Sequence, residues 1–249
     1  MERAGARFIL AGHSHAYALG LPPRGHDALP EIVEIGPAIV GLAGGWPRDE
    51  QYWDLLVQIS SGHVVVISWE GSQHVARFLL HQEPDFDFVL DGYPNREDVN
   101  HVVPLSLVRD YLDQQNFGLR EILAHLGSAS DCIKVVVGSP PPKNNDAILA
   151  SFLADEEYFV QACERAGQNI HDLRFTPALV RIKAWAVVQA LLAEAAAETD
   201  SLFVGVPNSV RDEGGFLLPR YWHQDITHGN LAYGDLMWTR IVEATSAKA

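Results

Sequence analysis

Three residues whose side chains can together perform acyl transfer lie near the two ends of this chain. Ser14 stands between two histidines near the N-terminus, and Asp225 precedes His228 by three positions near the C-terminus. A carboxylate three residues before a histidine can turn back to hold one ring nitrogen, which leaves the other nitrogen free to act as a base. The mechanism does not fix the order of these groups along a chain. The set therefore predicts Ser14 as a nucleophile, His228 as its general base and Asp225 as the orienting carboxylate.

The segment before Ser14 predicts how the serine is positioned. Residues 8–11 form a continuous apolar run that stops at Gly12, a pattern typical of a buried central strand of a parallel sheet. Ser14 then follows the carboxyl end of that strand, at the edge of an open α/β sheet where ligands bind. Taken alone, this pattern also fits an ordinary strand-to-helix turn whose serine caps the helix, and an isolated Asp-x-x-His pattern fits a capped loop. Only the two patterns together favour catalysis.

Strand and helix patterns alternate along the rest of the chain. Further apolar runs predict strands at residues 32–42, 63–69, 133–138 and 202–207. Helical stripes predict helices at 49–59, at 105–126 as one broken helix or two, from Thr176 to Glu198, and after Asn230; residues 81–103 read as a long surface excursion. This alternation predicts a single domain over residues 1–249, a three-layer α/β/α (flavodoxin-like) sandwich with a central parallel sheet of about five strands.

Composition limits the partners. The 249 residues carry 32 acidic and 18 basic side chains, a formal charge of −14, which opposes binding to nucleic acid or to an anionic membrane. Two cysteines are too few for a disulfide framework, and no apolar run is long enough for a membrane span. We expect a cytoplasmic protein that acts on a small molecule and needs no cofactor or metal; the oligomeric state cannot be read from the sequence.

Four short blocks in a fixed order resemble the SGNH (GDSL-like) hydrolase family. Each of the first three follows a predicted strand, and the fourth lies before the last helix: Gly12-His13-Ser14, Gly44-Gly45, Gly71-Ser72-Gln73 and Asp225-Ile226-Thr227-His228. The most specific similarity is in the C-terminal segment, which also includes Gly214, Gly215, Tyr221, Asn230, Tyr233 and Met237.

The resemblance implies a catalytic apparatus for ester chemistry. Carried over by position, it makes Ser14, His228 and Asp225 a triad, and it forms the oxyanion hole from the backbone N–H of Ser14, a backbone N–H of Gly44 or Gly45, and the side-chain amide of Gln73. The implied function is hydrolysis of carboxylic esters of small acyl groups, such as acetyl esters of carbohydrates, through an acyl-enzyme, with acyl transfer to another acceptor left open.

Two positions depart from the family pattern. His13 stands where the family has aspartate, and Gln73 stands where it has asparagine. Glutamine offers the same amide on a longer stem, and His74 is a substitute donor. Around this centre we expect a substrate pocket lined by His13, His15, Trp46, His74, Tyr221 and Trp222.

Two other function classes fit parts of the sequence. The His13-Ser14-His15 pattern also occurs where alternate side chains of a strand end hold a divalent metal ion, with further ligands available from His63, His74, His101, His223 and His228. Against this, later strand ends carry no repeated ligand pattern, and five strands are too few for an eight-stranded barrel. A non-catalytic binding module with the same fold is the third class, although such a module has no need of all three triad residues.

Overall fold

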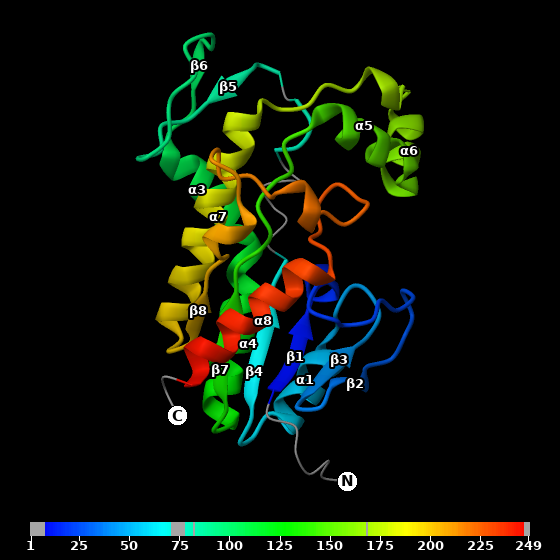
Figure 1. The fold of residues 1–249 in the computed structure, drawn as a ribbon, viewed down its shortest axis with the longest axis vertical. Helices are drawn as coiled ribbons and strands as arrows, with labels where there is room; N and C mark the ends of the chain where they lie inside the picture. Colours follow the sequence, from blue (N-terminus) through cyan, green and yellow to red (C-terminus); the bar gives the residue numbers. More distant parts are fainter. Residues whose placement is uncertain (1–7, 71–77, 82, 168, 247–249) are drawn as a thin grey trace.

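A computed structural model describes residues 8–70, 78–81, 83–167 and 169–246 of the chain. Its centre is a six-stranded sheet in which all neighbouring strands run parallel except the first pair, β2 and β3 (Figure 1). In spatial order the strands are β2 (Glu31–Gly36), β3 (Ile39–Ala43), β1 (Phe8–Gly12), β4 (Val64–Ser68), β7 (Ile133–Val137) and β8 (Leu202–Val204).

The parallel strands are apolar throughout because both faces of the sheet are covered. Along β1, Ile9 and Ala11 enter one core, whereas Phe8 and Leu10 enter the core on the opposite face. Successive side chains of a strand point to opposite faces, so a strand buried on both sides shows no polar alternation. This is why the run of residues 8–11 is a reliable sign of a central strand.

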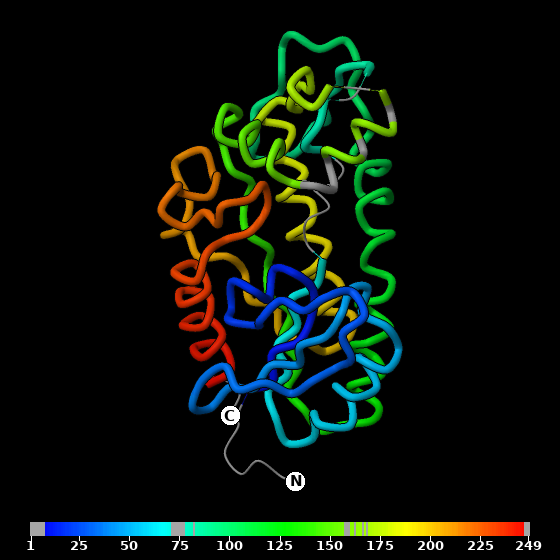
Figure 2. The backbone as a smooth tube through the Cα atoms, turned by 90° about the vertical axis from the view of Figure 1, so that its right-hand side faces the viewer, coloured from blue at the N-terminus to red at the C-terminus, as the bar shows by residue number. Residues whose placement is uncertain are grey.

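Helices form a layer on each face of the sheet. The first core contains side chains of α1 (Glu50–Ile59), α3 (Leu105–Asp113), α4 (Phe117–Ala129) and α7 (Ala178–Glu198), whereas the second contains side chains of α8 (Leu231–Ser246). Figure 2 shows α8, in red, on the side of the sheet opposite the green helices. The predicted three-layer α/β/α architecture is confirmed. No helix within the described ranges has the length and apolar content needed to cross a membrane.

Smaller elements extend beyond the carboxyl ends of the strands (Figure 1). A parallel pair is formed by β5 (Phe86–Asp87) and β6 (His101–Val102), within the predicted surface excursion. Two helices were not predicted, α5 (Asp146–Asp155) and α6 (Glu157–Ala166). Side chains of α5 pack into a small separate core around Leu79 and Ile226 rather than against the sheet, and α6 contacts α5. Single turns of 3₁₀ helix are η1 (Ser14–Tyr17), η2 (Gln114–Asn116), η3 (Ile170–Asp172), η4 (Asn208–Val210) and η5 (Pro219–Tyr221).

The predicted strand at residues 32–42 is wrong in one respect. It is a hairpin of two antiparallel strands, β2 and β3, joined by a two-residue turn at Pro37 and Ala38. Proline has no N–H to donate to a sheet, so the apolar run is divided at this point. The sheet therefore gains an antiparallel edge strand beside the five parallel strands. The stripe at 105–126 forms two helices, α3 and α4, separated by η2.

The carboxyl end of β1 is held by hydrogen bonds to two neighbouring elements, α1 and β4. The Gly12 N–H donates to the Tyr52 hydroxyl (2.9 Å), which donates in turn to the Leu42 carbonyl (2.7 Å). The His13 N–H donates to the Ser68 carbonyl (2.8 Å). Gly12 has a φ of +130°, and a Cβ atom there would overlap the Ser68 carbonyl, so only glycine fits. These contacts fix the direction in which the chain leaves the strand.

Gly234 should be required where α8 crosses the segment that follows η1. A Cβ atom on this helical glycine would overlap the Ala18 carbonyl. Alanine ordinarily stabilises a helix interior by about 1 kcal/mol relative to glycine. Here we expect Gly234→Ala to lower the free energy of unfolding instead, by roughly 2 kcal/mol or more, because backbone must shift.

Thermal and urea denaturation of the purified variant would measure this change. Gly127→Ala in α4 is the matched control, because its Cβ would meet only the flexible end of the Lys134 side chain. An increase in stability for Gly234→Ala would contradict the expectation.

Candidate active site

Ser14 lies directly beyond the carboxyl end of β1, as predicted. It is the first residue of η1, and His13 before it has an extended conformation. A residue at the start of a helical turn has an N–H that no helical carbonyl can accept. Within the described ranges the Ser14 N–H has no hydrogen-bond partner, so it is available to a ligand.

The end of β3 lies beside this position and is organised by Arg48, which the sequence analysis did not identify. Its Nε donates to the Gly12 carbonyl (3.0 Å), and its Nη1 donates to the carbonyls of Gly44 and Gly45. The Gly45 N–H already donates to the Ala28 carbonyl (2.8 Å). The Gly44 N–H has no such bond to any described residue, so Gly44 is the candidate oxyanion donor of the two glycines.

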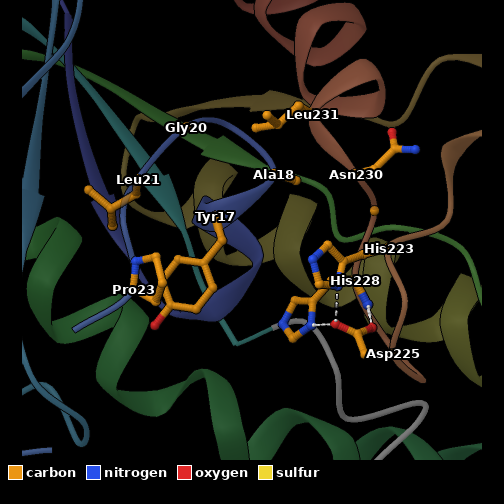
Figure 3. Close-up of a pocket in the computed structure, with 11 residues that line it drawn as sticks. Tyr17, Ala18, Gly20, Leu21, Pro23, His223, Asp225, His228, Asn230 and Leu231 are labelled. Atoms are coloured by element: carbon orange, nitrogen blue, oxygen red, sulfur yellow. Dashed lines mark hydrogen bonds and ion pairs between the residues drawn. The ribbon is translucent and has the colours of Figure 1, made fainter. Parts of the chain in front are cut away.

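Asp225 turns back onto His228 in the manner that the Asp-x-x-His spacing predicted. Its Oδ2 lies 2.7 Å from Nδ1 of His228, while its Oδ1 accepts the backbone N–H groups of Thr227 (2.9 Å) and His228 (2.7 Å). Figure 3 shows this carboxylate beside the ring of His228, joined to it by a dashed line. The ring is therefore oriented with Nε2 directed away from the aspartate.

The two ends of the chain meet at His228. Its ring centroid is 4.8 Å from that of His15, the residue after Ser14, and 6.3 Å from that of Tyr17. The Nε2 atom is buried and has no hydrogen-bond partner among the described residues, so it does not accept the Ser14 hydroxyl in this structure. Hydrogen bonds between nucleophile and base are often long before substrate binds. The fold thus brings the predicted serine and histidine onto neighbouring segments. Nε2 of His228 has no partner among the described residues, whereas Nδ1 is bound to Asp225.

Lys143 supports the Asp225 loop from inside the protein. Lys143 follows three prolines after β7, and only 1% of its surface is exposed. Its ammonium donates to the carbonyl of His223 (2.8 Å), to the carbonyl of Asp225 and, at 3.3 Å, to Oδ1 of Asp225. A lysine just beyond a strand end was the available signal in the sequence, but its partners are about 80 residues away along the chain.

The groups around Asp225 favour its ionised form. Burial by itself would raise the pKa of Asp225, but the hydrogen bond and charge of His228, with the charge of Lys143, hold that pKa well below its usual range. Burial lowers the pKa of Lys143, and Asp225 partly offsets this. The pKa of Glu156, whose carboxylate accepts the Ile226 N–H, is raised by burial. Asp225 is therefore the ionised carboxylate of this cluster.

His13 does not line a substrate pocket in the way we expected. Only 6% of the surface of His13 is exposed. Its ring lies against the indoles of Trp46 (4.9 Å between centroids), Trp53 (6.0 Å) and Trp69 (4.6 Å). Burial, with the nearby positive charge of Arg48, lowers the pKa of His13 from 6.5 to about 3. His13 is thus a neutral side chain in an aromatic enclosure.

A cavity of about 380 Å³ opens beside His228 (Figure 3). Neither Tyr221 nor Trp222 is among the described residues that line it, and both pack against the second core instead. The lining consists of the segment after η1 and the Asp225 loop: Tyr17, Ala18, Gly20, Leu21, Pro23, His223, Asp225, His228, Gly229, Asn230 and Leu231. Trp46 borders a different cavity, of about 370 Å³, together with His26 and Pro47.

The remaining predictions concern Gln73, His74 and the metal alternative. Gln73 and His74 lie outside the described residues. Within the described ranges, no three histidine, cysteine, aspartate or glutamate side chains are grouped so that they could hold a metal ion. The two histidines around Ser14 contact different neighbours, His13 the tryptophans and His15 the ring of His228. His63 lies before β4, at its amino end, and His101 lies in β6.

The neutral state of His13 should make the protein sensitive to acid. Because the folded-state pKa of His13 lies below the unfolded value, the unfolded chain binds a proton first, and stability falls as the pH drops below about 6.5. At pH 5 the expected loss is about 2 kcal/mol. His13→Phe should reduce this pH dependence.

Urea denaturation at pH 7 and pH 5 would measure the effect as a difference between the two conditions. His125→Phe, at an exposed position of α4, is the control. An unchanged pH dependence in His13→Phe would show that His13 is not the group responsible.

Comparisons with known proteins agree on the fold. No family model and no curated protein sequence matches the chain. Among solved structures, a protein assigned as an acylhydrolase from Bacteroides fragilis has a TM-score of 0.52 at 13% identity, over 99% of this chain and 89% of that one. Phospholipase A1 from Streptomyces albidoflavus has a TM-score of 0.51 at 9% identity, over 97% and 99%. The chain has the fold of the SGNH hydrolases, which its motif order predicted.

Proposed function

We propose that the protein is a serine esterase that cleaves esters of small acyl groups through an acyl-enzyme on Ser14. The observation that carries this proposal is the Asp225–His228 pair, oriented by three hydrogen bonds and packed against the residue that follows Ser14. The same fold occurs in a protein assigned as an acylhydrolase and in a phospholipase A1, and both names describe enzymes that remove acyl groups.

The proposed reaction begins when Nε2 of His228 accepts the proton of the Ser14 hydroxyl. The oxygen attacks the ester carbonyl, and the resulting tetrahedral intermediate collapses as His228 returns the proton to the departing alcohol. Water then repeats the sequence against the acyl-enzyme. Asp225 remains ionised throughout and stabilises the imidazolium that forms on His228, consistent with its lowered pKa.

Three donors are proposed for the oxyanion. The N–H groups of Ser14 and Gly44 have no partners within the described ranges, and the side-chain amide of Gln73 is the third donor. Preorganised donors of this kind stabilise charge that develops only in the transition state, and loss of one typically lowers the rate about 10²- to 10³-fold. Transfer of the acyl group to an acceptor other than water would use the same residues.

Removal of Ser14 or His228 should abolish most ester cleavage. We expect Ser14→Ala and His228→Ala each to lower kcat on 4-nitrophenyl acetate by roughly 10³-fold or more, with little further loss in the double variant, because triad members act as a unit. Initial-rate kinetics would measure this.

Two further observations separate the alternatives. A fluorophosphonate should add mass to the wild type at Ser14, whereas EDTA should leave the rate unchanged. Chelator-sensitive activity with an unlabelled Ser14 would favour the metal alternative. A correctly folded wild type that is neither labelled nor active would favour the binding module.

Lys143 should matter for rate as well as stability. Lys143→Met removes the donor to two carbonyls and to the catalytic carboxylate, so the Asp225 loop loses its internal support. Misplacement of a catalytic group by about 1 Å can cost roughly 100-fold. We expect kcat per folded molecule to fall roughly 10- to 100-fold, with a smaller change in KM.

Lys183→Met is the matched control for this variant. Lys183 is an equally buried lysine, but its ion pair is with Asp87 (2.5 Å) in the β5 segment. It should lose stability without losing kcat per folded molecule. Equal rate losses in the two variants, measured with active-site titration, would assign the Lys143 effect to folding alone.

A further inference from the structure

A second histidine shares the carboxylate that orients the proposed base. Nδ1 of His223 lies 2.9 Å from Oδ2 of Asp225, the same oxygen that lies 2.7 Å from Nδ1 of His228. From its place in the sequence, His223 was a candidate only for a metal ligand, and the proposed triad does not use it. Its side chain is 61% exposed, against 22% for His228, so solvent and ligands can reach it.

The backbone holds the two rings in a fixed relation. Trp222 and Gly229 form an antiparallel bridge, and the His223 N–H donates to the carbonyl of His228 (3.0 Å). The carbonyl of His223 is one of the acceptors of Lys143. His223 is therefore an exposed side chain on a backbone that is tied at both its N–H and its carbonyl, unlike a histidine on a free loop.

This geometry directs the far edge of the His223 ring into the cavity. Because Nδ1 faces Asp225, Nε2 lies on the other side of the imidazole. Figure 3 shows the His223 ring above the carboxylate, on the side of Tyr17 and Leu231, and the His228 ring beside the carboxylate. When Nδ1 carries the proton, Nε2 is a hydrogen-bond acceptor. The cavity thus contains an acceptor among walls that include the apolar side chains of Leu21, Pro23 and Leu231.

The cavity lies on the alcohol side of the scissile bond, an assignment that rests on the proposed function. The departing alcohol oxygen must reach Nε2 of His228 to receive its proton, whereas the carbonyl oxygen must face the N–H groups of Ser14 and Gly44. His228 lines the cavity, but neither Ser14 nor Gly44 does. A substituent attached to the alcohol oxygen is therefore the part of the ester that enters it.

We propose that His223 is a specificity-determining residue that accepts a hydrogen bond from a free hydroxyl of the leaving alcohol. The preferred substrates are then acyl esters of polyhydroxylated alcohols, sugars or glycerol, rather than esters of simple alkyl or aryl alcohols. The carbon framework of the polyol packs against the apolar wall. A volume of about 380 Å³ is suited to a single sugar ring or a glycerol unit.

The experiment compares esters that share an acetyl group and differ in the alcohol. The kcat/KM values of wild type, His223→Phe and His223→Gln are measured on glycerol monoacetate, on a mono-acetylated methyl glycoside, and on ethyl acetate and 4-nitrophenyl acetate. For His223→Phe we expect a loss of about tenfold on a polyol ester and less than about twofold on the other two, since one hydrogen bond to substrate is removed. His223→Gln should recover part of the loss.

The ratio of kcat/KM between two substrates does not depend on the fraction of active protein, so a partly unfolded variant still gives an answer. His125→Phe is the control and should leave all ratios unchanged. A selective loss on the glycoside or on glycerol monoacetate supports the proposal and identifies which polyol is used. Equal losses on every ester would overturn it and assign His223 to positioning Asp225; no loss on any ester would overturn it as well. In both of these cases Ser14 still reacts with fluorophosphonate, whereas a wild type that is inactive and unlabelled would overturn the proposed function itself.

Discussion

The ionised carboxylate of Asp225 is the group on which the rest of the site depends. A partly buried carboxylate without partners would be costly, and would take up a proton instead. Here its two oxygens face five donors: the backbone N–H groups of Thr227 and His228, the rings of His223 and His228, and the ammonium of Lys143. Because these donors together stabilise the charge, they favour the observed conformation of the loop that supplies most of them.

The fold brings this loop to the serine through the packing of α8. Asn230 caps the helix, since its Oδ1 accepts the Tyr233 N–H (3.1 Å), and its amide also donates to the Arg220 carbonyl (2.9 Å). Further along, the Trp238 indole donates to the Leu19 carbonyl (2.9 Å), which attaches the helix to the segment that follows Ser14. A single helix therefore connects the base loop to the nucleophile loop, even though the two are more than 200 residues apart in sequence.

The sequence predicted the features that depend on local spacing or on burial, and it did not predict those that depend on contacts between distant segments. The buried strands were predictable because an apolar run reports burial directly, and the Asp225–His228 contact was predictable because three residues of spacing determine it locally. The supports of Arg48 and Lys143 were not predictable, because their acceptors belong to other segments and any exposed lysine or arginine looks the same in sequence. The hairpin at residues 32–42 was merged into one strand because a turn of only two residues, Pro37 and Ala38, divides it. Helix α5 was missed because it packs outside the sheet, and α6 packs beside it.

The two halves of the site also differ in how their polar groups are satisfied. On the nucleophile side, backbone atoms are bound by Tyr52, Arg48 and Ser68, and His13 is kept neutral by its surroundings. On the base side, every oxygen of Asp225 is used, yet Nε2 of His228 is buried without a partner among the described residues. Leaving a buried acceptor unpaired costs about 1–3 kcal/mol. That cost falls on the atom that must accept the serine proton, so formation of the Ser14–His228 hydrogen bond on approach of a substrate recovers free energy at the start of the reaction.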